Sequence, residues 1–321
     1  RLEPGLRTTV TSGVQAAING LRAAGLKIDL VGALAIALRG AGPVGGSEVT
    51  TASALLLDLA TAQGEADSDA GQLAMAALDA LSALRPPGAA GRVARLLSHA
   101  ETLRRVRAAG ALGDIAAVQP TDSSIGALIA ILQSDRSPLV VAEAAWGLGK
   151  LPAQSAGKAI AALRGLLGQR DGMGGDRAVR SNALGALARL GRADVQDAQW
   201  LNEGEPAARA NAALLLATLP QKSPGMLSRL RALAQTDADH RVRANAQQAL
   251  RGQGAATSVT RTQFVGMRQV DADRQPLVEQ QFRLTLPDGL VRIGVTDRRG
   301  NVHEELLPAG MCDVEPLLSS P

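Results

Sequence analysis

The stretch Asp176-Arg-Ala-Val-Arg-Ser-Asn-Ala-Leu-Gly-Ala-Leu187 returns in altered form as Asp239-His-Arg-Val-Arg-Ala-Asn-Ala-Gln-Gln-Ala-Leu250. Shorter copies begin at Val106, Ala142 and Ala208. In each copy a Val or Ala is followed by a charged residue, and these charged residues align: Arg107, Glu143, Arg180, Arg209 and Arg243. These residues lie on average about 34 positions apart, and a steady period of this length is the signature of a stacked repeat.

Each copy follows a second amphipathic segment. Ile125–Leu132, Ile160–Leu167 and Met226–Leu233 carry apolar residues at helical spacing, which predicts helices with one buried face. The links before the copies contain residues that begin helices, such as Asp176 and Pro206. A single helix pair cannot bury its own apolar face. The sequence therefore predicts a mainly α protein, an α-solenoid of about seven helix pairs over residues 1–251.

The composition agrees with close helix packing. Apolar residues make up 46% of the chain but aromatic residues only 1%, so the core must consist of Ala, Leu and Val. Small side chains fill space only where backbones approach closely. The lone Cys312 excludes an intramolecular disulfide framework. The net charge of +4 permits nucleic-acid binding without arguing for it.

The apolar period changes to two after a Gly/Ala/Ser/Thr-rich linker at residues 252–261. Phe282, Leu284 and Leu286 alternate with polar residues, and Val291, Ile293 and Val295 alternate with Arg292 and Gly294. A Pro-Asp-Gly turn separates the two runs. With a first strand near 263–270 and two further turns, the pattern predicts a five-stranded antiparallel β-sandwich over residues 262–318.

The repeated pattern Asp-x-x-Val-Arg-x-Ala-Ala-x-Ala-Leu-Gly resembles bacterial HEAT-like repeats of the phycobilisome-lyase type. The resemblance implies the solenoid fold and very little about function, because that family includes scaffolds, adaptors and a few enzymes.

The C-terminal segment resembles transthyretin-like, carboxypeptidase-regulatory-like modules. The residues that carry this resemblance are Phe282-Arg-Leu-Thr-Leu-Pro-Asp-Gly289, the Gly294–Gly300 motif and Leu307-Pro-x-Gly-x-Cys-x-Val314. Similar modules extend the tips of bacterial type VI secretion spikes. The resemblance implies docking to such an assembly.

Two groups of residues are candidate sites. Three acid–arginine pairs at i, i+4 spacing predict a structural ladder: Asp176–Arg180, Glu205–Arg209 and Asp239–Arg243. The candidate partner-binding residues are Arg104, Arg105 and Arg107, as an anionic contact, and Trp146, as either core filling or a partner hot spot.

No catalytic group emerges from the sequence. A hairpin at Pro308–Gly310 would place Cys312 opposite Leu306, on the apolar face, and His303 on the other face. That geometry excludes a thiol–imidazole pair and predicts Cys312 as a small buried residue. We expect no enzyme activity, no cofactor and no metal site.

The leading hypothesis is a protein–protein interaction scaffold or adaptor, set in a bacterial secretion or contractile-injection assembly. The solenoid would offer a groove to one protein and the β module would dock onto another. Two alternatives stay open: a lyase-type factor that modifies chromophores, and nucleic-acid binding through the arginine-rich face. No segment is long enough to span a membrane. The compartment stays open between the bacterial cytoplasm and export with a secretion assembly.

Overall fold

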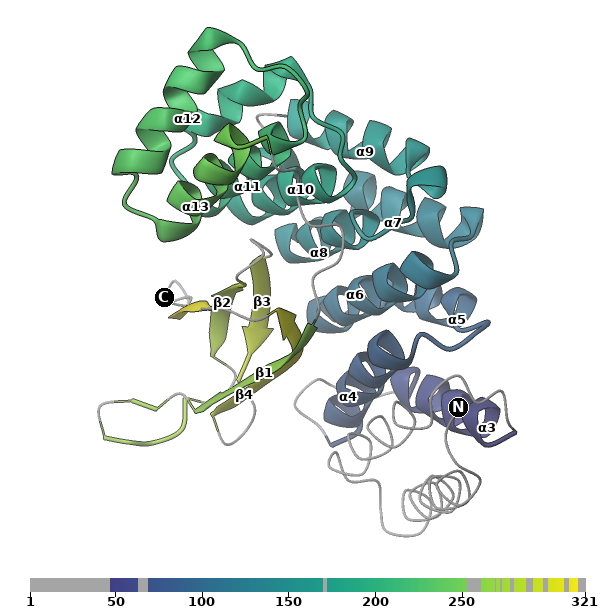
Figure 1. Cartoon of the computed structure of the whole chain (residues 1–321). Coiled ribbons are helices and arrows are strands. Elements are labelled where there is room, and N and C mark those ends of the chain that lie inside the picture. The colour runs from purple at the N-terminus through teal and green to yellow at the C-terminus, as the bar shows by residue number, and fades with distance from the viewer. Residues whose placement is uncertain are drawn as a thin grey trace, which may run out of the picture. The chain divides into compact units, whose positions relative to one another are not determined.

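The computed structural model describes residues 47–62, 69–169, 172–252, 261–268, 270–271, 273–277, 280–286, 291–296, 300–308 and 312–316. By their contacts the residues form two compact units, Arg1–Ala127 and Leu128–Pro321, named here the N-terminal and the C-terminal unit. Helices occur in both units, whereas every described strand belongs to the C-terminal unit (Figure 1).

Helices follow one another in pairs from residue 47 to residue 250, as the repeat predicts. Those that begin before the unit boundary are α3 (Ser47–Ala60), α4 (Asp69–Leu84), α5 (Ala90–Arg95) with the 3-10 turn η1 (Leu96–Ser98), α6 (Thr102–Val118) and α7 (Asp122–Ser134). The helices predicted before residue 47 lie outside the described residues, so the total of seven pairs stays a prediction.

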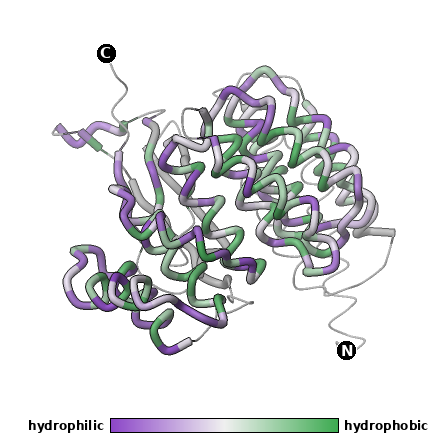
Figure 2. Tube along the Cα trace, turned by 90° about the horizontal axis from the view of Figure 1, so that it is seen from above, coloured by the Kyte–Doolittle hydropathy of each residue, from purple (hydrophilic) through white to green (hydrophobic). Residues whose placement is uncertain are grey.

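The helices that follow are α8 (Pro138–Leu148), η2 (Ala153–Ser155), α9 (Gly157–Gly168), η3 (Met173–Gly175), α10 (Arg177–Arg189), η4 (Val195–Asn202), α11 (Pro206–Ala217), α12 (Pro224–Thr236) and α13 (His240–Leu250). The predicted helix starts are confirmed. Pro206 occupies the first turn of α11, and the Asp176 carboxylate accepts the backbone N–H groups of Ala178 and Val179 at the start of α10. Figure 2 shows hydrophobic and hydrophilic residues alternating along the helices.

The second helices of the pairs stack on one another. In the C-terminal unit they form the row α8, α10, α11, α13. Gly149 shows how closely this row packs, because a Cβ there would lie 2.5 Å from the Cα of Ala186 in α10. The core consists largely of fully buried alanines and leucines, so the small residues of the sequence serve the close helix packing that the composition predicts.

Five described strands follow the helices, close to where the sequence predicts them. They are β1 (Arg261–Arg268), β2 (Gln281–Thr285), β3 (Val291–Val295), β4 (Asn301–Pro308) and β5 (Asp313–Pro316). The predicted β2–β3 hairpin is confirmed, with Phe282 opposite Gly294 and Leu284 opposite Arg292. The linker predicted at 252–261 lies almost entirely outside the described residues.

The β-sandwich predicted for residues 262–318 is wrong. The described strands form a two-stranded sheet, β1–β4, and a separate three-stranded sheet in the order β3–β2–β5. The apolar stripe of the three-stranded sheet consists of Phe282, Leu284 and Leu286. It packs against Trp146 of α8, so the partner layer of the three-stranded sheet is the helix row (Figure 1).

The predicted hairpin at Pro308–Gly310 is also wrong in its pairing. Strand β4 pairs with β1, and β5 pairs with β2, where Val314 lies opposite Leu284. Cys312 is half-buried and packs against the Trp146 cluster. The prediction of Cys312 as a small buried residue therefore holds only in part, and the strand geometry from which it came is wrong.

Candidate functional site

Trp146 lies completely buried where helix α8 meets the three-stranded sheet. Its ring belongs to one hydrophobic cluster with three side chains of the sheet segment: Phe282, Leu284 and Leu286. Trp146 is thus a core residue in this structure, and the core that it fills is made jointly by a helix and by strands. Its alternative role as a partner hot spot stays a prediction.

Helix α10 shapes the other side of the tryptophan. A Cβ on Gly185 would lie 3.1 Å from the ring atom Cζ3, so the absent side chain makes room for the ring. The guanidinium carbon of Arg189 lies 4.5 Å from the ring centroid, in a cation–π contact. Backbone spacing and charge on α10 therefore both favour this position of Trp146.

Asn182, also on α10, binds the main chain of the sheet. Its Nδ2 donates to the carbonyl of Val291 at 3.1 Å, and its Oδ1 accepts the backbone N–H of Val291 at 3.0 Å. The same Nδ2 donates to the carbonyl of Ala142 on α8 at 3.0 Å. A buried amide satisfied on both ends fixes one strand residue against two helices.

Two ion pairs cross from the helices to the sheet. Arg241 of α13 lies 3.0 Å from Asp313 of β5, and Glu205, which precedes α11, lies 3.9 Å from Arg283 of β2. Although burial acts against its charge, Asp239, Asp313 and Glu205 raise the pKa of Arg241. Four residues contact the sheet from the helix side, and we name them the docking face: Trp146, Asn182, Glu205 and Arg241.

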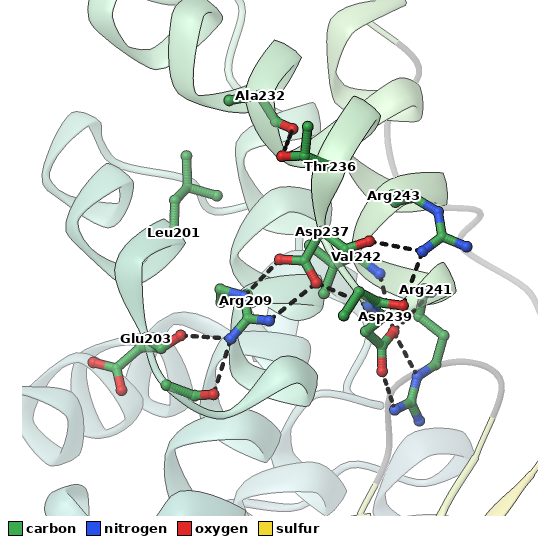
Figure 3. Close-up of polar contacts among 12 residues, drawn as sticks. Leu201, Glu203, Arg209, Ala232, Thr236, Asp237, Asp239, Arg241, Val242 and Arg243 are labelled. Carbon is green, nitrogen blue, oxygen red and sulfur yellow. Dashed lines mark hydrogen bonds and ion pairs between the residues drawn. The ribbon is translucent and has the colours of Figure 1, made fainter.

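Asp239 holds Arg241 in place from the start of α13. Its carboxylate accepts the backbone N–H groups of Arg241 and Val242, and the guanidinium of Arg241 lies 2.7 Å from it (Figure 3). Burial acts to raise the pKa of Asp239, but these hydrogen bonds and the charge of Arg241 outweigh it and lower the pKa to about 2.

The predicted i, i+4 ion pairs of the ladder are wrong. Arg180 pairs with Glu203 of the following repeat and donates to the carbonyls of Gly174 and Gly175. The carboxylates of Asp176 and Asp239 accept hydrogen bonds from backbone N–H groups at the starts of α10 and α13. Glu205 forms an ion pair with Arg283. The acids nearest in sequence are thus engaged, so the long arginine side chains reach back to the preceding loop.

Arg209 shows the pattern most clearly (Figure 3). Its guanidinium makes two bonds to the carboxylate of Asp237, at 2.9 and 3.0 Å, and two to the carbonyls of Glu203 and Gly204. Arg243 makes the same pair of carbonyl bonds, to Asp237 and Ala238. The ladder arginines are therefore bonded inside the protein and do not form an open stripe of guanidinium groups.

The three arginines of the predicted anionic contact do not converge. Arg104 is 1% exposed and donates to the carbonyl of Ala62 at 2.7 Å. Arg105 donates to the carbonyls of His99 and Ala100, both at 2.9 Å. Arg107 lies 3.3 Å from Asp79. The pKa of His99, whose carbonyl accepts from Arg105, is lowered first by burial and then by the charge of Arg104.

Arg105, not Arg107, is the ladder arginine of its repeat. It bonds the carbonyls six and five residues before it, as Arg180, Arg209 and Arg243 do. The alignment of Val106-Arg107 with Val179-Arg180 is therefore two residues out of register with the structure. Arg107 takes the helix position that Asn182 takes in α10.

Sequence reasoning missed the asparagines. The Nδ2 group of each donates to a carbonyl of the preceding second helix: Asn182 to Ala142, Asn211 to Ser181 and Asn245 to Ala210, at 2.8 to 3.0 Å. The available signal was an amide recurring at one repeat position inside an apolar helix face. Nothing in the sequence distinguishes Asn182, which alone of the three also binds a strand among the described residues.

The described residues contain no group of three or more His, Cys, Asp or Glu side chains that could hold a metal ion. None of the described helices has the length and apolar character needed to cross a membrane.

A family model of HEAT repeats matches residues 174–251, which include α10 to α13. No curated protein matches this chain. Among solved structures, an engineered protein is 21% identical over 77% of this chain and 70% of its own, with a TM-score of 0.47. A designed armadillo repeat protein in complex with the peptide (KR)4 is 19% identical over 76% of this chain and 99% of its own, with a TM-score of 0.38.

The family match confirms the prediction of a HEAT-type helical repeat. It does not extend to residues 263–316, whose resemblance to transthyretin-like modules stays a prediction. The chain is thus a mainly α, HEAT/armadillo-like repeat protein, and residues 174–251 are the part that matches the family model of HEAT repeats.

Proposed function

We propose that this chain is a non-enzymatic scaffold that binds other polypeptides through the helix row α8, α10, α11 and α13. The observation that carries the proposal is the double hydrogen bond between Asn182 and Val291. A side-chain amide that pairs with both main-chain groups of one residue recognises an extended polypeptide whatever its side chains. Stacked helical repeats commonly offer extended binding surfaces of this kind.

The rest of the docking face supports this function. Trp146 offers an apolar anchor, and tryptophan is among the residue types that contribute most to binding energy. Glu205 and Arg241 place opposite charges beside it, so a bound segment is selected by the order of its own charges. Apolar anchoring, main-chain pairing and charge selection together describe a peptide-binding surface, whereas the bonded ladder arginines give nucleic acid no comparable site.

A displayed library of random peptides tests the proposal. We expect selection on the purified chain to enrich extended peptides with alternating apolar residues, and Asn182→Ala to weaken their binding at least tenfold, about 1.4 kcal/mol. Asn245→Ala is the matched control, because Asn245 bonds only a helix carbonyl in the described structure. Selected peptides whose binding survives Asn182→Ala would place the binding surface elsewhere.

The finer setting, an accessory or adaptor of a bacterial secretion or contractile-injection assembly, remains a proposal from the residues of the C-terminal segment. Sedimentation of the chain with a purified spike protein tests it, and two independently migrating species would count against it. The chromophore-lyase alternative predicts an absorbance change on titration with a tetrapyrrole. No feature of the described structure favours that alternative.

A further inference from the structure

We infer that the docking face is a strand-binding surface already occupied by the chain's own three-stranded sheet, which an outside polypeptide must displace. This inference rests on the proposed function, because it names what regulates access to the same surface. The three-stranded sheet (β3–β2–β5) would then act as an intramolecular competitor rather than as a second, independent binding module.

The apolar contacts are those of a bound segment. Phe282, Leu284 and Leu286 lie at alternate positions, and all three are at most 1% exposed. They are buried in one hydrophobic cluster with Trp146. Separation would therefore expose one large apolar surface on the sheet and another on α8, and each side is complementary to the other.

The polar contacts match a competitor rather than a permanent core. Asp313 is 45% exposed although it pairs with Arg241, and the other ion pair to the helices, Arg283–Glu205, spans 3.9 Å. An ion pair with an exposed partner, or one at such a distance, contributes little net stability and is weakened by salt. The charges therefore set the orientation of the sheet without locking it in place.

The main-chain contact between Asn182 and the sheet is also one that another polypeptide can make. In the described part of the sheet, Asn182 holds the single residue Val291 at the start of β3. Another extended segment offers the same N–H and C=O groups. The competing partner is therefore an extended polypeptide with apolar residues at alternate positions, a cation that reaches Glu205 and an acid that reaches Arg241.

The test reverses both charges of the sheet without changing the net charge. The variant Arg283→Glu/Asp313→Arg places like charges against Glu205 and Arg241 in the full-length chain. The readout is the fluorescence of Trp146 in a Trp200→Phe background, since the chain contains only two tryptophans. We expect a red shift of emission and a severalfold rise in acrylamide quenching, with unchanged helical circular dichroism.

The matched control is Asp273→Arg/Arg274→Glu. These two exposed residues lie in the same C-terminal segment, and no described contact joins them to the helices. The control should leave Trp146 as protected as in the parent chain. A charge-reversed variant whose Trp146 stays equally protected would overturn the inference, because the sheet would then be a fixed part of the helix core.

The peptide selection separates this inference from the proposed function. If both hold, the charge-reversed variant binds the selected peptides more tightly than the parent chain does. If parent and variant bind equally, the sheet does not compete and the inference fails while the proposed function stands. If Trp146 becomes exposed but neither protein binds any peptide, the proposed function fails although the sheet is displaceable.

Discussion

Asp239 performs two tasks at a single residue, because it caps α13 and pairs with Arg241. Its pKa falls from the ordinary value of 3.8 to about 2 on folding. The charged carboxylate therefore stabilises the folded chain above about pH 4, and this stabilisation is lost as the pH falls towards 2. This pH dependence of the stability thus arises from the contacts that one side chain makes in the folded chain.

We expect Asp239→Asn to lower the free energy of unfolding at pH 7 by about 1 kcal/mol, since asparagine still caps the helix but cannot pair with Arg241. The deficit should shrink as the pH approaches 2. Urea unfolding at several pH values measures it. Asp176→Asn is the control, because Asp176 caps α10 and makes no ion pair in the described structure. A deficit that stays constant with pH would assign the effect to capping alone.

Gly149 illustrates close backbone packing at one position. Gly149→Ala would set a Cβ 2.5 Å from the backbone of Ala186, so we expect a loss of about 2 kcal/mol or more. Gly165→Ala on α9 is the control, because nothing lies within 4 Å of its new Cβ. There the helix propensity of alanine should increase stability by up to about 1 kcal/mol. Thermal unfolding that moves both variants in the same direction would contradict the packing argument.

At the scale of elements, the ladder arginines couple one repeat to the next. Arg209 reaches Asp237, whose carboxylate is only 6% exposed, through two hydrogen bonds. A double-mutant cycle of Arg209→Gln and Asp237→Asn should give a coupling energy of about 1–3 kcal/mol. The exposed Arg92–Asp58 pair should give less than about 1 kcal/mol. Equal coupling energies in the two cycles would mean that the ladder pair stabilises the fold no more than an exposed ion pair does.

The sequence predicts the helices better than their polar contacts. Periodicity and helix-start residues identified α7, α9 and α12 and the starts of α10, α11 and α13, because these signals are local. The partners of Arg180 and Arg209 are 23 and 28 residues away. Only the stacking of repeats brings such residues together, so the local i, i+4 rule chose the wrong acids.

The same limit applies to the sheet. Alternation predicted its strands and the β2–β3 hairpin, but it could not say which surface would cover Phe282 and Leu284. An apolar strand face needs a covering layer, and a second sheet satisfies that need in the sequence as well as a helix does. The choice of Trp146 depends on the helix row, which exists only in the folded chain.

At the scale of the whole molecule, substitutions of Asn182 and Asn211 should distinguish the docking of the sheet onto the helix row from the stacking of the helices on one another. Asn182→Ala leaves the N–H and C=O of Val291 without their partner, whereas Asn211→Ala affects the carbonyl of Ser181. Each should cost about 1–3 kcal/mol on urea unfolding. Only Asn182→Ala should increase the quenching of Trp146. Equal quenching in both variants would mean that stacking alone protects the tryptophan.

The forward pairing of the ladder gives the repeat array a direction. Arg180 and Arg209 each bind an acid of the following repeat, while Arg243, in the last described helix, makes only the two carbonyl bonds to its own loop. Both acids, Glu203 and Asp237, stand two residues before the N-cap of a second helix. Within the described residues, the array thus ends in an arginine that pairs with no acid. A repeat grafted after α13 with an acid at that position should continue the chain of ion pairs, much as a monomer adds to the growing end of a polymer.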